Sequence, residues 1–176
     1  VYVWDVASGQ CLHTLSSQGT ELEWLAWSPN GATLAGADTR GAIHLWDVRM
    51  RPHSPIRHVL DAGAYPWDLA FSPDSCLLAS VAEDPVVRLW DVESGVCVQM
   101  LSGHTQNVSS AVFLPDRKTL VSSGYDSTLR FWNVQTGELL NTLRVPGPYA
   151  GLNITGVTGI SEAQKAALRT LGAVEE

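Results

Sequence analysis

Short runs of alternating hydrophobic and polar residues, separated by polar turns, make up most of this 176-residue chain. The clearest segment, residues 103–143, holds four such runs, at 108–113, 119–123, 129–134 and 139–143. Alternation with a period of two is typical of β-strands, and turn residues such as those of Asp126-Ser127-Thr128 favour hairpins between them. The segment therefore predicts a four-stranded antiparallel meander.

The same pattern recurs at a nearly constant spacing. A Trp-Asp or Trp-Asn pair begins at Trp4, Trp46, Trp90 and Trp132, so that successive pairs lie 42, 44 and 42 residues apart. Three of the pairs follow a turn of common form, Ser-Pro-Asn-Gly, Ser-Pro-Asp-Ser or Leu-Pro-Asp-Arg. Four strands with a Trp-Asp signature in about 40–45 residues are typical of one propeller blade. Over about residues 1–143 the chain resembles the WD-repeat β-propeller family.

This resemblance predicts an all-β fold, a partial WD-repeat β-propeller of three four-stranded blades plus the outer half of another. The half-blade covers residues 1–15, the blades cover 16–60, 61–101 and 102–143, and a tail covers 144–176. Because propellers close with about 4–8 blades, we expect the remaining blades to come from a longer chain. Self-association of partial rings is the alternative.

The tail predicts a short C-terminal helix at about residues 162–171. Ser161 and Gln164 form a capping box, and Gly172 supplies a stop. The tail also resembles those that end the WD-repeat regions of bacterial signalling proteins.

Composition narrows the classes of partner. The chain is 45% hydrophobic and 16% charged, and its net charge of −7 disfavours a nucleic-acid partner. No apolar run approaches the roughly 20 residues of a membrane helix, so no membrane partner is expected. The cysteines, Cys11, Cys76 and Cys97, form no ligand-spaced pair and predict reduced, partly buried thiols in a cytoplasmic protein. The sequence indicates no metal site and no cofactor.

One set of polar residues suggests a catalytic triad, but the family resemblance implies a structural role. In WD-repeat proteins the matching residues form a buried hydrogen-bond chain, which here would be His104, Ser122, Asp126 and Trp132. A buried indole N–H needs an acceptor, and Ser122 can supply it. Ser122 falls within a strand rather than at a strained turn, so we expect no catalytic residues.

The other two repeats keep fewer residues of this hydrogen-bond chain. The second keeps Ser80, Asp84 and Trp90, with Ala62 at the histidine position. The first keeps only Trp46, since the other positions hold Gln18, Gly36 and Arg40. The first repeat is therefore expected to be the least rigid.

The resemblance also implies a partner-binding face, formed by the residue before each turn Asp and by the start of each innermost strand. The matching candidates are Tyr65, Trp67, Glu83, Asn107 and Tyr125. Packing between blades is an equal alternative for Trp67, and Trp24 and Trp27 are expected in the core. The basic segment 49–58 is expected to be a solvated loop, with a docking site for an acidic partner as the alternative.

The predicted function is a non-catalytic protein–protein interaction scaffold, as the C-terminal WD-repeat part of a larger bacterial signalling or regulatory protein. The alternative is a propeller with a small-ligand pocket or an enzymatic role.

Overall fold

The computed structural model describes residues 1–17, 19–49, 56–144, 146, 152–159, 161–170 and 173–175. The chain divides into two compact units, Val1–Thr142 and Leu143–Glu176. The first unit contains the strands that the hydrophobic alternation predicts, except for the last two residues of the final strand, and the second unit contains the helix.

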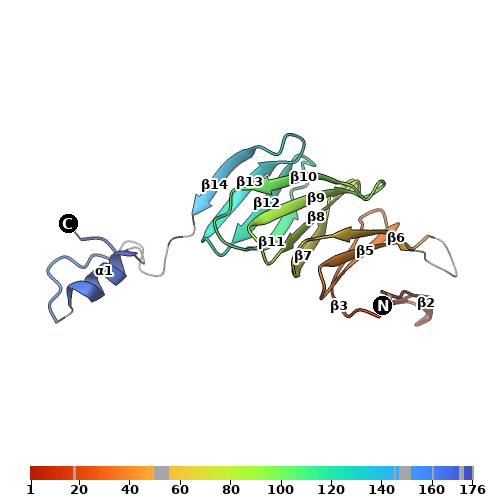
Figure 1. Cartoon of the computed structure of the whole chain (residues 1–176), viewed down its shortest axis with the longest axis horizontal. Helices are drawn as coiled ribbons and strands as arrows, with labels where there is room; N and C mark the ends of the chain where they lie inside the picture. The colour runs from red at the N-terminus through yellow and green to blue at the C-terminus, as the bar shows by residue number, and fades with distance from the viewer. Residues whose placement is uncertain are drawn as a thin grey trace. The chain divides into compact units, whose positions relative to one another are not determined.

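The first unit consists of one two-stranded sheet and three four-stranded antiparallel sheets, each ordered as in the chain (Figure 1). The two-stranded sheet pairs β1 (Tyr2–Trp4) with β2 (Cys11–Thr14). The first four-stranded sheet contains β3 (Leu22–Trp27), β4 (Thr33–Asp38), β5 (Ala42–Asp47) and β6 (Ile56–Asp61). The second contains β7 (Pro66–Phe71), β8 (Leu77–Ala82), β9 (Val86–Asp91) and β10 (Cys97–Ser102). The third contains β11 (Val108–Phe113), β12 (Thr119–Gly124), β13 (Thr128–Asn133) and β14 (Leu139–Arg144).

The first strands of consecutive sheets lie next to one another, since β7 contacts both β3 and β11. These strands are therefore innermost, and hydrophobic residues fill the space between the sheets. One cluster joins Val81 and Leu89 of the second sheet to Val108, Leu120 and Trp132 of the third. The prediction of an all-β, partial propeller with a short C-terminal helix is confirmed.

The turn between the first and second strands of each four-stranded sheet needs one residue with positive φ. Gly31, Ser75 and Arg117 occupy this position, with φ of 69°, 65° and 61°. Glycine adopts this conformation without steric cost, whereas a residue with a Cβ does not. The third sheet therefore carries backbone strain at Arg117 that the first sheet avoids.

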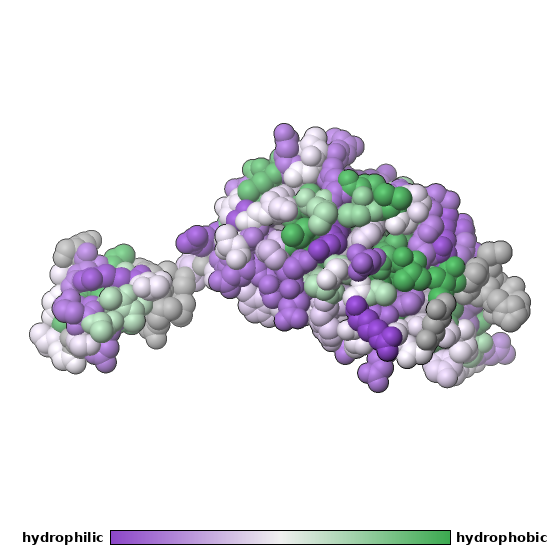
Figure 2. Space-filling model, viewed as in Figure 1, coloured by the Kyte–Doolittle hydropathy of each residue, from purple (hydrophilic) through white to green (hydrophobic). Residues whose placement is uncertain are grey.

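The prediction that Trp24 and Trp27 belong to the core is wrong. Trp24 is 40% exposed and Trp27 is 45% exposed, because in the described part of the chain only the two-stranded sheet β1–β2 lies beside β3–β6 on that side. On the side of the molecule seen in Figure 2, hydrophobic residues lie among hydrophilic ones. Two thiols also differ from expectation, since Cys11 and Cys76 are exposed, whereas Cys97 is half-buried; all three are free.

The second unit contains helix α1 (Glu162–Thr170), which begins at the predicted capping box. The Gln164 N–H donates to Ser161 Oγ at 3.3 Å, and the Ser161 N–H donates to Gln164 Oε1 at 2.8 Å. Leu171 and Gly172, the predicted end of the helix, lie outside the described residues. Among the helices that the structure describes, none is long and apolar enough to cross a membrane.

Candidate functional site

The third sheet brings His104, Ser122, Asp126 and Trp132 together in one hydrogen-bonded chain. The Trp132 Nε1–H donates to Ser122 Oγ at 2.8 Å, and Ser122 Oγ lies 2.8 Å from His104 Nε2. His104 Nδ1 lies 3.0 and 3.1 Å from the two carboxylate oxygens of Asp126. Because a carboxylate only accepts, Nδ1 carries the proton and Nε2 accepts the Ser122 hydroxyl. Every polar atom in this chain therefore has a partner.

Asp126 is the charged end of this hydrogen-bonded chain. Burial alone would raise the pKa of Asp126, but several donors outweigh it. These are the Thr128 hydroxyl at 2.6 Å, the Thr105 N–H at 3.0 Å and the His104 imidazole. Their hydrogen bonds favour the ionised form and hold the pKa of Asp126 well below its usual range. The loop at Thr105 and the turn at Thr128 are thereby tied to one carboxylate.

The second sheet repeats half of this arrangement. The Trp90 Nε1–H donates to Ser80 Oγ at 2.8 Å. Ala62 stands where the histidine would be, and Arg88 reaches Asp84 instead, with its two terminal nitrogens 3.2 and 2.6 Å from the carboxylate oxygens. A Cβ on Gly63 would lie 3.3 Å from the Arg88 guanidinium. The arginine therefore gives Asp84 the partner that His104 gives Asp126 in the third sheet.

In the first sheet the tryptophan lacks the serine hydroxyl that the other two sheets provide. Gly36 replaces the serine, and a Cβ there would lie 2.8 Å from the Trp46 ring, so the indole packs directly against the backbone. As a result, Trp46 Nε1 is buried without a hydrogen-bond partner among the described residues. Gln18, at the predicted histidine position, lies outside those residues.

Asp38, two positions before Arg40, supplies the carboxylate of this first sheet. It accepts the N–H groups of Arg40 and Ala42 at 2.9 and 3.0 Å and lies 3.1 Å from His44 Nε2. Burial would raise the pKa of Asp38, but these contacts with His44 and the backbone lower it. His44 pairs with Gly36 in the register, as Arg88 pairs with Ser80. The register, which the sequence alone does not give, could have identified this pair.

The structure gives Ser122 no access to a substrate. The residue is 0% exposed, and its hydroxyl is engaged by both Trp132 and His104. A nucleophile must reach the reacting atom, so this arrangement fits a structural connection rather than a catalytic triad.

The predicted partner-binding residues lie together, in what we call the Tyr125 patch: Tyr65, Trp67, Glu83, Asn107 and Tyr125. The Glu83 N–H donates to the Tyr65 carbonyl at 2.8 Å, and the Tyr125 N–H donates to the Asn107 carbonyl at 2.9 Å. Between these pairs, the Val108 N–H donates to the Asp84 carbonyl at 3.0 Å. The second and third sheets are thereby joined through backbone groups beneath the patch.

Aromatic contact completes the Tyr125 patch. The rings of Trp67 and Tyr125 meet edge to face, with centroids 5.5 Å apart. Tyr125 is 63% exposed, whereas Trp67 is half-buried and also packs against the hydrophobic cluster between the sheets. Trp67 therefore packs between blades, as one alternative expected, and its ring also contacts Tyr125.

A depression beside Tyr125 is lined by Thr105, Gln106 and Asn107. The Tyr65 hydroxyl donates to the carboxylate of Glu23 in β3, which extends the Tyr125 patch to the first sheet. Glu83 is exposed and Asn107 is half-buried. The patch thus combines an aromatic edge, an amide and a carboxylate on a rigid backbone.

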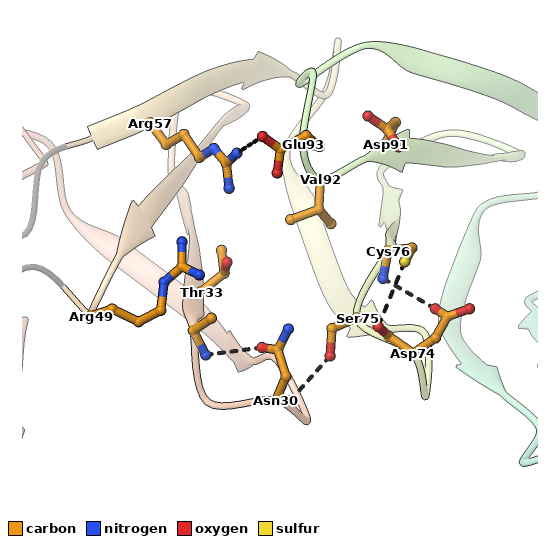
Figure 3. A pocket seen from close by; sticks show the side chains of 11 residues that line it. Asn30, Thr33, Arg49, Arg57, Asp74, Ser75, Cys76, Asp91, Val92 and Glu93 are labelled. Atoms are coloured by element: carbon orange, nitrogen blue, oxygen red, sulfur yellow. Dashed lines mark hydrogen bonds and ion pairs between the residues drawn. The ribbon is translucent and has the colours of Figure 1, made fainter.

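A second depression lies at the opposite ends of the strands, between the first and second sheets (Figure 3). Arg49 and Arg57 line one wall, and Asp74, Asp91 and Glu93 line the other. Arg57 forms an ion pair with Glu93, and Arg49 forms one with Asp47 at 2.6 Å. Arg49 and Arg57 are thus neutralised within the chain, which disfavours these two side chains as a site for an acidic partner. Residues 50–55 of the basic segment lie outside the described residues.

No group of three or more potential metal-ligating side chains occurs among the residues that the structure describes. Cys76 borders the second depression, and burial together with Asp74 and Asp91 raises the pKa of its thiol. A raised pKa disfavours the reactive thiolate.

Comparison with known proteins places these features in context. Residues 9–47, 53–91 and 95–133 match the family model described as WD domain, G-beta repeat. Among relatives, the small ribosomal subunit protein RACK1y of Oryza sativa subsp. japonica is 31% identical over 110 residues, covering 62% of this chain and 32% of that protein. The human WD repeat and SOCS box-containing protein 1 is 30% identical over 115 residues, covering 63% of this chain and 27% of that protein.

Solved structures give the same fold. The structure titled "Structure of U3-55K" has a TM-score of 0.68 at 22% identity, covering 74% of this chain and 41% of that one. "Crystal structure of RRP9 WD40 repeats" has the same TM-score and identity, covering 75% of this chain and 41% of that one. The chain thus spans less than half the length of each protein named.

Proposed function

This chain belongs to the WD domain, G-beta repeat family, and from that premise we propose that it is a non-catalytic scaffold that binds protein partners through the Tyr125 patch. WD-repeat proteins generally act as protein-interaction scaffolds. The hydrogen-bond chain of His104, Ser122, Asp126 and Trp132 serves stability in this proposal, because it holds the turn that carries Tyr125.

The proposal rests on the contacts that the residues of the Tyr125 patch make with one another. Backbone hydrogen bonds fix Tyr65 to Glu83 and Asn107 to Tyr125, and the Trp67 and Tyr125 rings meet across the second and third sheets. Tyrosine and tryptophan on a fixed backbone lose little conformational entropy on binding, and they are enriched among the residues that dominate interface energies. The patch therefore has the composition and the rigidity of a protein-binding surface.

The wider context of the chain is part of the same proposal. We propose that further blades complete the ring beside the exposed Trp24 and Trp27, and that they belong to a longer chain rather than to a second copy. A place in a bacterial signalling protein and a cytoplasmic location stay predictions. The relatives named above are a plant and a human protein.

Affinity capture tests the proposal directly. The chain is immobilised in extract of its native cells, and the bound proteins are compared with those bound by a Tyr65→Ala, Trp67→Ala and Tyr125→Ala variant. A matched variant changes exposed apolar residues at the start of β14, Leu139→Ala and Leu140→Ala. We expect the patch variant to lose bound proteins that the matched variant keeps. Equal capture by all three would overturn the proposal.

A further inference from the structure

The turns around the Tyr125 patch carry an excess of negative charge. At this end of the first and second sheets, four acidic residues are exposed: Glu21, Glu23, Asp61 and Glu83. Arg40 is the exposed basic residue of the same turns. Within the described part of the chain, neither Glu21 nor Glu83 has an ion-pair partner.

Two other arginines at this end, Arg88 and Arg130, already face carboxylates. Arg88 contacts Asp84 at 2.6 Å, and Asp126 holds His104, with Arg130 4.0 Å away. The arginines therefore cannot neutralise Glu83 without giving up these partners. Among the exposed charges of these turns without an ion pair, Glu21 and Glu83 outnumber Arg40, so an incoming ligand meets a net negative charge.

The aromatic groups add a second, independent preference. The face of an exposed tyrosine or tryptophan ring attracts a cation through its quadrupole. The Tyr125 ring is 63% exposed and is held by its contact with Trp67, so it can receive a cation without being reordered. Carboxylates that flank such a ring strengthen this preference.

We propose that the Tyr125 patch binds a basic peptide segment, with a lysine or arginine side chain against Tyr125 and Trp67 and its charge balanced by Glu83. This inference rests on the proposed function, since it names the chemical class of the protein segment that the scaffold would bind. The acidic net charge of −7 favours the approach of such a segment over long range.

Nuclear magnetic resonance titration of the whole 176-residue chain tests the inference. The probes are three capped ten-residue peptides on the same Gly-Ser host, carrying three lysines, three acetyl-lysines or three glutamates. The reporter is the indole Nε1–H signal of Trp67, identified by its loss in Trp67→Phe. We expect the lysine peptide alone to shift this signal to saturation.

The variants locate the binding. Tyr125→Ala and Glu83→Gln should each weaken it about two- to fivefold, the range of one exposed cation–π contact or ion pair. Tyr125→Phe, which keeps the ring, should bind as the unchanged chain does. Glu138→Gln makes the same charge change at the opposite ends of the strands and should have no effect.

Several outcomes would overturn the inference: no saturable shift with the lysine peptide, equal binding of the glutamate peptide, or lysine binding that neither Tyr125→Ala nor Glu83→Gln weakens. If capture still depends on the patch in any of these cases, the scaffold proposal stands and only the basic-peptide inference fails. If capture is also unaffected, both fail.

Discussion

The indole N–H of Trp132 donates to the buried hydroxyl of Ser122 at 2.8 Å. The same contact recurs between Trp90 and Ser80, but in the first sheet Gly36 stands at the serine position, and Trp46 Nε1 has no partner among the described residues. Each of the three sheets thus has a tryptophan at the same position, but the hydrogen bonding of its indole N–H differs from sheet to sheet. Differences in local stability should follow.

Removing the Ser122 hydroxyl should be costly. Ser122→Ala leaves Trp132 Nε1 and His104 Nε2 buried without their partner, and an unsatisfied buried polar group costs about 1–3 kcal/mol. We expect a loss of unfolding free energy in this range in urea denaturation followed by tryptophan fluorescence. Ser123→Ala, on the same strand with a half-buried side chain, should cost less. Equal losses would show that the hydrogen-bond chain adds nothing.

The carboxylate of Asp126 should make stability depend on pH. The pKa of Asp126 is depressed in the folded chain, whereas an unfolded Asp titrates near about 3.9. Its stabilising contribution is therefore complete above about pH 4 and is lost as pH falls toward the folded pKa. Asp126→Asn should lower the unfolding free energy at pH 7, and the difference from the unchanged chain should shrink below about pH 4. A difference that stays constant from pH 7 to pH 3 would refute this role.

The first sheet should open more readily than the third. Among the described residues its tryptophan Nε1 has no hydrogen-bond partner, and the first sheet has the pair Asp38–His44 in place of the full set of four residues. Amide hydrogen exchange in residues 32–48 should therefore be faster than in residues 119–134. Slower exchange in 32–48 would mean that the Asp38–His44 pair compensates fully.

Arg117 offers a substitution that should stabilise the chain. Its φ of 61° is unfavourable for a residue with a Cβ, and Gly31 shows that glycine occupies the same turn position in the first sheet. Arg117→Gly should raise the unfolding free energy by about 0.5–1 kcal/mol, since relief of strain outweighs the added entropy of the unfolded chain. The measurement is thermal unfolding of this variant. The control is Lys118→Gly, which places glycine at a position where φ is not positive. A lower melting temperature for Arg117→Gly would contradict the strain argument.

Much of the fold follows from the sequence because each blade is a local structure. Alternation over six residues and a turn every few residues specify the meander, and the spacing of Trp46, Trp90 and Trp132 specifies its repetition. What the sequence could not specify depends on neighbours that are distant in the chain. Trp24 and Trp27 have the pattern of core residues, but whether a side chain is covered depends on what lies beside β3.

The Asp38–His44 pair shows the same limit at the level of the site. Matching by position placed Arg40 where the turn Asp should be, and the alternative carboxylate lies two residues earlier. Only the strand register brings His44 opposite Gly36 and toward Asp38. In the third sheet, by contrast, His104, Ser122, Asp126 and Trp132 follow the family pattern residue by residue, and the structure brings them together.

Site-specific photo-crosslinking tests the central claim, that the Tyr125 patch is the protein-binding surface, most directly. A benzophenone amino acid replaces Tyr125 in one version of the chain and Leu139, an exposed residue of β14, in the other. Both are irradiated in extract of the native cells. We predict discrete protein adducts at position 125 that are absent at position 139. Adducts of equal pattern at both positions, or adducts at position 139 alone, would contradict the claim.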